Sequence, residues 1–403
     1  MQEIQRGIRL WIPRRLRLEM TNRRRRQSRD KQAGGSPRYR RAPFVISYWL
    51  GPVLIFENYL THQRVAGDSF FCDLLAWCDE PRGVAEICSR FPREKPSAIL
   101  DGIRRLQKYS LLQAYAGTRR DTSDVMHGWK KWSPSASHFH FGTKDAKYER
   151  NDAEDFSSLR ELVKRKPLPP RRKQYPGIKR VKLSIPDRTD EFSRVLQERR
   201  TWREFSRKPL DLRQLETLLW LVFGVQAWAR IPGVGRLPLK TSPSGGALHP
   251  LEAYALIRNV SGIAPGIYHY DDEGHSLELL RAGCRRAEIQ KLLAEQDWFC
   301  DSAFVVFLTA AFQRSQWKYE HPRAYRVVLA EAGHVCQTFC LTATWLRLAP
   351  FCTMALADTK VEQALGVDGI TESVVYAMGV GLRPKRAAMG DRLRQTAGGL
   401  WRS

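Results

Sequence analysis

RRTWREF at residues 199–205 and SPSGG at residues 242–246 are the two stretches on which the interpretation of this chain depends. The first places three arginines and a threonine hydroxyl within five positions. Arginine offers planar, permanently charged forks that suit a phosphate group. The second is a loop of small residues ahead of an apolar run, and its glycines would let a flat ring approach the backbone. Together they predict a bound phosphorylated flavin.

Each stretch also has a plainer interpretation when it is taken alone. An arginine run in an arginine-rich chain is often only a solvated charged surface. A loop of Pro, Ser and Gly also occurs in ordinary turns. The prediction therefore depends on both stretches together and on the residues that follow them.

The bulk composition indicates a two-domain globular protein. The chain has 403 residues, and single hydrophobic cores stop growing at roughly 250–300 residues. Hydrophobic residues make up 43% of it, with 12 Trp and 17 Phe, which is enough for a sizeable core. No stretch approaches the roughly 18 uninterrupted apolar residues of a membrane span, and the N-terminus lacks the apolar segment of a secretory signal. We therefore expect a cytoplasmic protein without a membrane partner.

The eight cysteines include no Cys-x-x-Cys pair, so neither a zinc site nor a disulfide framework is expected. Cys336 and Cys340 lie four residues apart beside His334, a spacing that could hold a metal on one helix face. The run around them is apolar on nearly every side, which favours core packing. Reduced thiols agree with a cytoplasmic location.

The net charge of +25 is concentrated at the N-terminus. Residues 1–42 hold fourteen Lys and Arg against three acidic residues, including four consecutive arginines at 23–26. This composition predicts a disordered basic arm. Three interpretations stay open: contact with nucleic acid or a membrane, a solvated tail, or translation from a start upstream of the true one, with Met20 as a candidate.

Residues 43–120 predict a winged-helix-like module, in which three short helices have flanking strands. Strands are expected at 44–49 and 53–56, joined by a turn at Gly51 and Pro52. Helices are expected at 70–77, 84–91 and 97–109, the last with Ser97 as its N-cap, and a closing strand at 111–115.

Residues 121–187 are interpreted as a connecting segment, and residues 188–403 as an α+β domain. The connection is polar and irregular over 117–163, anchored by Trp129, Trp132 and Pro134. Residues 164–182 hold nine Lys and Arg and four Pro, a linker composition. In the α+β domain, helices are expected at 191–200, 211–225, with Asp211 as N-cap, 287–295 and 324–348. Strands are expected at 253–258, 266–270, 303–310 and 373–379.

Lys318 and Tyr319 offer two adjacent titratable groups, after a predicted buried strand and a loop at 312–316. A lysine can serve as a general base where burial disfavours its charged form. A surface lysine beside a packed tyrosine fits the same spacing and is the favoured interpretation from spacing alone.

Glu331 and His334 lie three residues apart in the predicted long helix, so they share one face. They are either a buried polar pair at a subunit interface or an acid–base pair, and the structural role is favoured. The helix at 324–348 is hydrophobic on most sides and must be buried, which makes it a candidate subunit contact.

Taken in this order, the pieces resemble the nitroreductase superfamily, and specifically the SagB/ThcOx-type azoline dehydrogenases. The matching pieces are RRTWREF at 199–205, PLDLRQLETLLW at 209–220, TSPSGGALHPLEAYAL at 241–256, GIYHYD at 266–271, KYEHPRAYR at 318–326, EAGHVCQTFCLTA at 331–343 and VVYAMGVG at 374–381. They span about 180 residues in the family's order. WKKWSPSASHFHFGTKD at 129–145 resembles the segment that precedes this domain in such proteins. The combination is specific, although no single piece is.

The resemblance implies an α+β, nitroreductase-like domain that binds FMN, preceded by the winged-helix-like (peptide-clamp-like) module. It implies that the phosphate and ribityl chain are held by Arg199, Arg200, Thr201 and Arg203. The ring would be lined by Pro243, Ser244, Gly245 and Gly246. Gln337 would add a contact, although Thr338 stands where the family often has Asn. The cation near the chain end would be Arg383, Lys385 or Arg386, and the loop at 350–358, which lacks the family's usual glycines, would pass near the ring.

The resemblance also implies a reaction, in which azoline rings of a ribosomally made peptide are oxidised to thiazoles or oxazoles. A hydride would pass to flavin N5 while a base removes a proton from the adjacent carbon. Lys318 is the expected base, with Tyr319 orienting it or sharing the proton. The superfamily builds two sites between two chains, so a homodimer is expected. The expected partners are the precursor peptide and, as a candidate, a cyclodehydratase.

Two other functions stay open. One is an NAD(P)H-dependent, nitroreductase-like enzyme that acts on small quinones or nitroaromatics. The other is a non-catalytic flavin-binding or DNA-binding regulator.

The N-terminal module has three candidate roles. Modules of this type bind leader peptides in peptide-maturation enzymes by adding a strand to a sheet edge, and the strand at 53–56 is the expected edge. A purely structural clamp and DNA binding are the alternatives. Glu86, Arg90, Asp101 and Arg104 give the predicted helices a mixed charge, so nucleic acid is not an expected partner.

Overall fold

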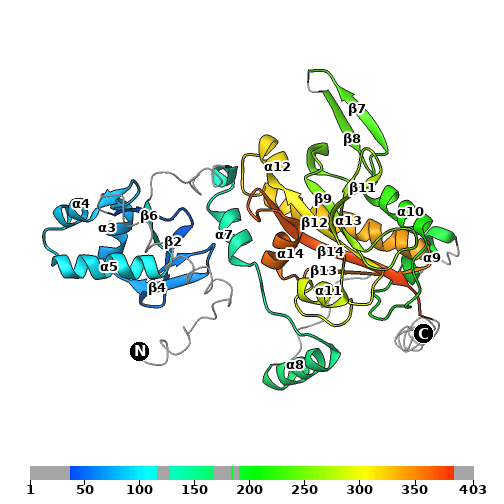
Figure 1. Cartoon of the computed structure of the whole chain (residues 1–403), viewed down its shortest axis with the longest axis horizontal. Coiled ribbons are helices and arrows are strands. Elements are labelled where there is room, and N and C mark those ends of the chain that lie inside the picture. Colours follow the sequence, from blue (N-terminus) through cyan, green and yellow to red (C-terminus); the bar gives the residue numbers. More distant parts are fainter. Residues whose placement is uncertain (1–36, 116–127, 167–182, 185–189, 234, 385–403) are drawn as a thin grey trace. The chain divides into compact units, whose positions relative to one another are not determined.

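The computed structural model describes residues 37–115, 128–166, 183–184, 190–233 and 235–384. The chain forms two compact units, residues 1–120 and 121–403, and each is described by itself (Figure 1). Most of the predicted basic arm and of the linker at 164–182 lies outside the described residues, as do Lys385 and Arg386. Within the described ranges, none of the helices combines the length and apolarity that a bilayer crossing requires.

Over residues 37–115, the N-terminal unit has two small sheets and three helices. One sheet consists of β2 (Val45–Leu50), β3 (Val53–Asn58) and β4 (Gln63–Gly67), in that order. The other has the order β5-β1-β6, from β5 (Arg82–Gly83), β1 (Arg38–Arg41) and β6 (Leu112–Tyr115). The helices are α3 (Ser69–Trp77), α4 (Val84–Arg90) and α5 (Pro96–Lys108). The three predicted helices and the predicted strands at 44–49, 53–56 and 111–115 are therefore confirmed, while β1, β4 and β5 were not expected.

Local chemistry explains how these helices begin. The Asp68 carboxylate accepts hydrogen bonds from the first amides of α3 and so satisfies donors that the helix cannot. In α5, Ile99, Ile103 and Leu106 recur at helical spacing and are buried in one apolar cluster with residues of α3. The prediction that Ser97 caps α5 is wrong. The helix begins one residue earlier at Pro96, whose fixed φ and missing N–H suit the first helical position.

The prediction that the strand at 53–56 is the edge of its sheet is also wrong. Residues 53–56 belong to β3, which is the central strand and pairs on one side with β2 and on the other with β4. The sequence could not reveal this order because β4 is short and partly polar, so it was missed as the third strand. The outer strands of this sheet are β2 and β4.

The C-terminal unit is built on a six-stranded antiparallel sheet. Its strands are β9 (Leu251–Ile257), β10 (Gly266–Asp271), β11 (Ser276–Ala282), β12 (Phe304–Ala311), β13 (Leu348–Thr353) and β14 (Glu372–Leu382). Their order is β11-β10-β9-β12-β14-β13, and each neighbouring pair is antiparallel. The predicted α+β class is therefore confirmed, as are the four predicted strands.

Helices cover both faces of this sheet (Figure 1). They are α9 (Glu191–Glu198), α10 (Leu212–Phe223), α11 (Arg286–Leu292), α12 (Phe312–Lys318), α13 (Ala324–Trp345) and α14 (Asp358–Leu365). The predicted capping of α10 by Asp211 is confirmed, because its carboxylate accepts the Arg213 amide at 2.8 Å. A two-stranded hairpin of β7 (Ala227–Ile231) and β8 (Gly235–Leu239) follows α10 and was not expected.

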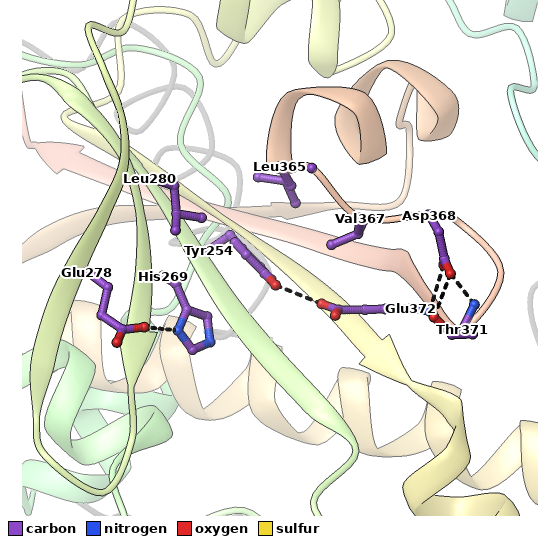
Figure 2. A pocket seen from close by; sticks show the side chains of 10 residues that line it. Tyr254, His269, Glu278, Leu280, Leu365, Val367, Asp368, Thr371 and Glu372 are labelled. Carbon is purple, nitrogen blue, oxygen red and sulfur yellow. Dashed lines mark hydrogen bonds and ion pairs between the residues drawn. The ribbon is translucent and has the colours of Figure 1, made fainter.

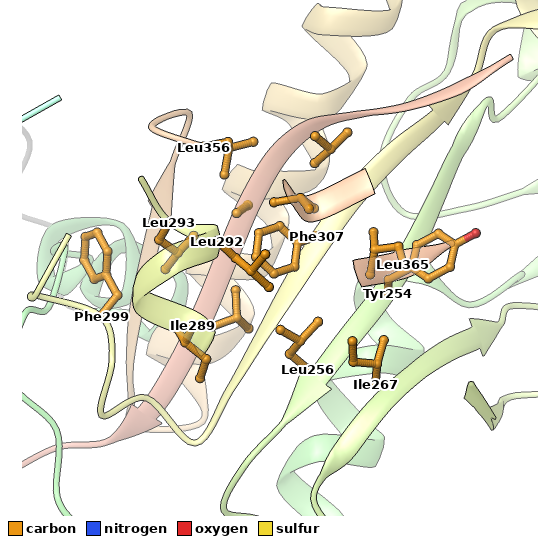
Figure 3. Close-up of a cluster of buried hydrophobic side chains, with 14 of the residues drawn as sticks. Tyr254, Leu256, Ile267, Ile289, Leu292, Leu293, Phe299, Phe307, Leu356 and Leu365 are labelled. Atoms are coloured by element: carbon orange, nitrogen blue, oxygen red, sulfur yellow. The ribbon is translucent and has the colours of Figure 1, made fainter. Parts of the chain in front are cut away.

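The strand β12 shows how the two helical layers share the sheet. Val305 and Phe307 belong to an apolar cluster with Leu292 of α11 and with residues of α14 (Figure 3). Phe304, one position earlier, instead contacts Phe339 of α13, with ring centroids 6.3 Å apart. Successive side chains of a strand point to opposite faces, so β12 is buried on both. This explains why its sequence is a continuous apolar run.

Two predictions about irregular segments are wrong. The loop expected at 312–316 is the helix α12. The region 117–163, expected to be irregular, contains α7 (Ser135–Gly142) and α8 (Asp152–Arg165) in its described part. The start of α8 carried a readable signal that was missed, since Asn151 accepts the Glu154 amide as an N-cap.

Residues 128–145, called the strap from here on, pack into the C-terminal unit. Trp129 and Trp132, the predicted anchors, are 1% and 0% exposed. Both indole rings contact Phe312 of α12 and Tyr325 of α13. His140 of α7 stacks on Trp129 and hydrogen-bonds the Tyr325 hydroxyl through Nδ1 at 2.8 Å. The strap is thus an aromatic part of the core and not a loose connection.

His140 gives this contact a testable pH dependence. Burial lowers the pKa of His140 from 6.5 to about 3. Between these values the unfolded chain binds a proton that the folded chain does not. The contribution of the neutral His140 imidazole to the free energy of unfolding is therefore fully present above pH 6.5. As the pH falls below 6.5, this contribution is lost by up to about 1.4 kcal/mol per pH unit. We expect His140→Gln to flatten the fall in melting temperature below pH 6.5, while His138→Gln, at an exposed position, keeps the wild-type slope. Equal slopes in all three proteins would contradict a buried neutral imidazole.

Candidate functional site

The arginine stretch follows α9 and is hydrogen-bonded to two neighbouring strands of the sheet. The Trp202 amide donates to the Pro350 carbonyl of β13 at 2.9 Å, and the Ser206 amide donates to the Leu382 carbonyl of β14, also at 2.9 Å. The stretch therefore runs beside the edge strand of the sheet and its neighbour. Residues 350–353, expected to be loop, are part of β13.

The three arginines of this stretch differ in where they point. Arg203 lies over the Trp298 ring at 5.2 Å, and its Nε is buried without a partner among the described residues. Arg199 acts electrostatically on Cys340 and Cys352. Arg200 is exposed and donates from Nη1 to the carbonyls of Gln197 and of Arg199 at 2.7 Å each. Arg203 thus has a buried N–H without an acceptor in the described residues, whereas Arg200 already donates to carbonyls at the end of α9.

One candidate cation from the chain end joins this cluster. Arg383 stacks over the Trp202 ring at 5.4 Å and donates from Nε to the Leu348 carbonyl at 2.9 Å. Thr201 is exposed between Arg200 and Trp202. Of the three cations that the sequence left open, Arg383 is the one within the described residues, and it reaches the arginine stretch through Trp202.

A polar cluster that the sequence did not indicate lies beside Arg199. The Cys340 thiol, the Tyr376 hydroxyl and Arg199 together lower the pKa of the Cys352 thiol. Cys336 and Cys340 are buried, so the prediction that they pack in the core is confirmed. Cys352 was missed because its partners come from three other elements and share no sequence spacing with it. The opposite shift holds for the partners of Cys352, because burial and Cys352 raise the pKa values of the Cys340 thiol and the Tyr376 hydroxyl.

The SPSGG loop is fixed to α13 by two hydrogen bonds. Ser244 Oγ donates to Glu331 Oε2 at 2.6 Å, and Ser242 Oγ bonds Thr338 Oγ1 at 2.7 Å. Burial raises the pKa of Glu331, which the Ser244 hydroxyl and the Gly245 amide partly offset. Glu331 therefore holds the loop in place, while His334 is exposed. The favoured structural role of Glu331 is therefore supported, but its hydrogen-bonded side-chain partner within the described chain is Ser244 and not His334.

Gly246 meets the predicted catalytic pair. Its φ is +70°, a left-handed conformation that glycine adopts without strain. A Cβ at this position would lie 2.8 Å from Lys318 Nζ and 2.8 Å from Tyr319 Oη. A Cβ on Gly245 would lie 2.5 Å from Val327 Cγ1. Two stretches some seventy residues apart are thus in contact, and the loop has no room for side chains at either glycine.

Lys318 and Gln337 both lie on the surface of the chain. Lys318 is exposed and Tyr319 half-buried, which agrees with the favoured interpretation of their spacing, and Lys318 Nζ lies 5.4 Å from the Tyr319 ring centre. Gln337 is exposed on α13, and within the described chain its neighbour Thr338 makes the bond to the loop. Residues of a helix point in different directions every 100°, so position 338 faces the loop where 337 does not.

An open hollow of about 530 Å³ lies apart from these residues (Figure 2). It is lined by Tyr254, His269, Glu278, Leu280, Leu365, Gly366, Val367, Asp368, Thr371 and Glu372. Tyr254 Oη donates to Glu372 at 2.9 Å, and His269 Nδ1 bonds Glu278 at 2.8 Å. Hydrogen bonds to Glu252 and Glu278 raise the pKa of His269 to about 9, so the imidazole is charged at neutral pH. These groups are already paired with one another, and none of the residues predicted for the site lines the hollow.

Comparison with known proteins identifies the family. The nitroreductase family profile matches residues 196–382. "Putative nitroreductase MJ1384" of Methanocaldococcus jannaschii is 31% identical over 194 residues, which are 48% of this chain and 89% of that protein. This chain belongs to the nitroreductase family. The predicted resemblance and the nitroreductase-like fold are confirmed, and the chain is an oxidoreductase of a family that generally uses flavin cofactors.

Two further relatives have names that concern peptide processing. The trifolitoxin-processing protein TfxB of Rhizobium leguminosarum bv. trifolii is 31% identical over 142 residues, 34% of this chain and 38% of that protein. The microcin B17-processing protein McbC of Escherichia coli is 28% identical over 165 residues, 40% of this chain and 57% of that protein. This chain is thus similar to parts of both.

Proposed function

We propose that this protein is an FMN-dependent dehydrogenase that oxidises azoline rings to thiazoles or oxazoles in a ribosomally made peptide. The observation that carries the proposal is the contact of Gly246 with Lys318 and Tyr319, which sets a potential base beside the loop expected to line a flavin ring. The similarity to proteins named for trifolitoxin and microcin B17 processing supports a peptide substrate.

The residues of the site fit a flavin phosphate and ring. Arg203 has a buried Nε that lacks a partner within the described chain, and a buried donor of this kind calls for an acceptor. Arg199, Thr201, Arg203 and Arg383 would hold the phosphate and ribityl chain, and Arg200 would have to leave its helix carbonyls to join them. Pro243, Ser244, Gly245 and Gly246 would lie along the ring, because glycine has no side chain of its own to keep a flat group from the backbone.

The chemistry divides between the cofactor and the chain. Bound FMN would supply the hydride acceptor that lets two hydrogens leave the azoline ring. Lys318 Nζ would take the proton from the ring carbon, and Tyr319 Oη would orient Nζ or share that proton. The ring loses one hydride and one proton, and its aromatisation favours the products.

Because Lys318 is exposed in the single chain, something must exclude water from it during the reaction. Val327 of α13, which lies against Gly245, is 40% exposed, and Trp317, next to Lys318, is 68% exposed. Exposed apolar side chains around a site indicate a surface that is covered in use. We propose that a second copy of the chain covers it in a homodimer and that the bound peptide completes the enclosure.

The N-terminal unit would recognise the leader of the precursor peptide. The added peptide strand would pair with β2 or β4, the outer strands of the β2-β3-β4 sheet. Trp49 and Leu50 at the end of β2 are 69% and 56% exposed and offer apolar contacts there. The azoline itself must come from a dehydrative cyclisation of Cys, Ser or Thr, so a cyclodehydratase is the proposed partner. A structural clamp stays the alternative for this unit.

The similarity to MJ1384 favours a second candidate, a nitroreductase that uses NAD(P)H and acts on small quinones or nitroaromatics. The two functions differ in the electron donor. An azoline peptide would reduce the flavin in the first, whereas NAD(P)H would reduce it in the second.

One anaerobic experiment separates them. The purified yellow protein is mixed with a precursor peptide that carries azolines, or separately with NADH or NADPH, and the flavin absorbance is followed. We expect the peptide to bleach the flavin stoichiometrically and to lose two hydrogen atoms per azole by mass spectrometry. Bleaching by NAD(P)H alone, with an unchanged peptide, would establish the second candidate and refute the first.

A further inference from the structure

The end of α12 lies between the site and the strap. Lys318 is the last residue of α12, and Tyr319 leaves the helix with φ −112° and ψ 89°. The two side chains therefore emerge where regular helical hydrogen bonding stops. The Tyr319 amide still donates to the Ser315 carbonyl at 2.9 Å, whereas the Tyr319 carbonyl, beyond the helix end, needs a partner from elsewhere in the chain.

The strap supplies that contact from some 190 residues earlier in the chain. The indole N–H of Trp132 donates to the Tyr319 carbonyl at 2.9 Å. The ring of Trp132 packs edge-on against Phe312 at the start of α12, with centroids 6.1 Å apart. Next to Trp132, Lys131 forms an ion pair with Glu320. Both ends of α12 are thus held by one tryptophan.

The far end of the strap is tied down as well. Lys144 Nζ lies 2.6 Å from a carboxylate oxygen of Glu362 on α14, and both side chains are nearly buried. Asp145 accepts the Thr359 amide at 3.0 Å. These contacts are independent of the tryptophans, so a change at Trp132 need not release the strap.

We propose that Trp132 is a positioning residue that sets the direction of Lys318 and Tyr319 against the Gly246 loop. The Trp132 indole restrains the Tyr319 carbonyl after the pair, and its ring packs on Phe312 at the start of α12 before the pair. The backbone that carries Lys318 and Tyr319 is therefore restrained from both sides. The pair then stays against Gly246, where no side chain separates it from the loop backbone. The structural part of this proposal stands alone, whereas its catalytic part rests on the proposed function.

Trp129 provides a matched control within the same aromatic cluster. It is equally buried, it also packs on Phe312, and its indole N–H donates to the Ile370 carbonyl at 2.7 Å. Ile370 lies before β14 and not beside Lys318. Trp129→Phe and Trp132→Phe therefore remove the same donor from the same aromatic cluster. They release different carbonyls, and Trp129 has the additional stacking contact with His140.

The first test measures amide hydrogen exchange in the full chain and needs no turnover. A lost buried hydrogen bond should speed local exchange about fivefold. We expect Trp132→Phe to speed exchange in peptides that cover residues 316–322, and Trp129→Phe to do so at residues 368–372. If both variants loosen the same residues, or if neither affects 316–322, the positioning role of Trp132 is wrong.

The second test measures azoline oxidation by flavin-loaded protein. Misplacing a reacting group can cost up to roughly a hundredfold in rate. For Trp132→Phe we expect kcat to fall roughly tenfold or more, with KM and flavin content unchanged and with a melting temperature equal to that of Trp129→Phe. A Trp129→Phe variant that loses as much kcat would reduce Trp132 to a general packing role.

The two tests keep the positioning claim separate from the proposed function. If the wild-type protein does not oxidise azolines but the exchange patterns differ as expected, the proposed function fails and the contact stands. If azolines are oxidised and the exchange patterns are the same, the function stands and the positioning claim fails.

Discussion

Replacing Arg203 with alanine is expected to give a protein that folds but purifies almost without flavin. A hydrogen bond to a charged group contributes about 1.5–3 kcal/mol, so losing it weakens binding roughly tenfold to more than a hundredfold. In the chain without ligand, the buried Arg203 Nε has no partner among the described residues. Its removal should therefore cost the unloaded protein no hydrogen bond. The measurement is FMN affinity by fluorescence quenching, together with the melting temperature of the flavin-free form.

Arg200→Ala is the comparison that makes this result specific. Arg200 lies three positions earlier and already donates to two carbonyls at the end of α9, so its loss should weaken FMN binding less than the loss of Arg203. Both changes remove one positive charge from the same short stretch, so their long-range electrostatic effects should be similar. Equal losses would mean that the stretch attracts FMN by net charge alone. Full binding by Arg203→Ala would remove this arginine from the site.

Replacing Lys318 with alanine is expected to leave the yellow colour and to abolish most azoline oxidation. A positioned general base contributes roughly a hundredfold to ten-thousandfold in rate. The side chain lies on the Gly246 loop and not on the arginine cluster, so the flavin content should be unchanged. The measurement is single-turnover reduction of the bound flavin by an azoline peptide, which isolates the chemical step.

Two conservative variants separate the ways in which the pair could act. Lys318→Arg keeps the charge and most of the length but cannot give up its proton at ordinary pH, so it should be as slow as the alanine variant. Tyr319→Phe keeps the ring and loses the hydroxyl, so a smaller loss is expected if Tyr319 only orients the lysine. Wild-type rates in Lys318→Arg would show that the charge acts without proton transfer, and wild-type rates in Lys318→Ala would exclude Lys318 from the reaction.

The elements that the sequence predicted are those with a strong local signal. Asp211 caps α10 as expected because an N-cap acts within three residues of itself. The apolar run at 303–310 is a strand buried on both faces, which its composition stated directly. In contrast, α12 is a seven-residue helix of mostly polar composition. Its contacts with Trp129 and Trp132 are distant in sequence, so no local pattern indicated it.

The candidate site divides in the same way. The residue types of the arginine stretch and of the SPSGG loop predicted a phosphate and a flat ring, and the family match agrees with that chemistry. The three arginines could not be distinguished from the sequence. In the structure, Arg203 has a buried Nε without a partner among the described residues, whereas Arg200 donates to carbonyls at the end of α9. The spacing of Lys318 and Tyr319 favoured a surface lysine beside a packed tyrosine, and Lys318 is exposed. Spacing could not indicate that both residues meet Gly246.

The amino-acid sequence alone was enough to recognise the segments that resemble nitroreductases, their order along the chain and the chemistry that each could provide. Folding alone decided that Gly246 meets Lys318 and Tyr319, that Glu331 holds the loop, and that Trp132 reaches the Tyr319 carbonyl. The physical reason is range. Capping and periodicity act over a few residues and can be read locally, whereas these contacts join positions some seventy to 190 residues apart, and sheet order, which no single segment encodes, brings them together.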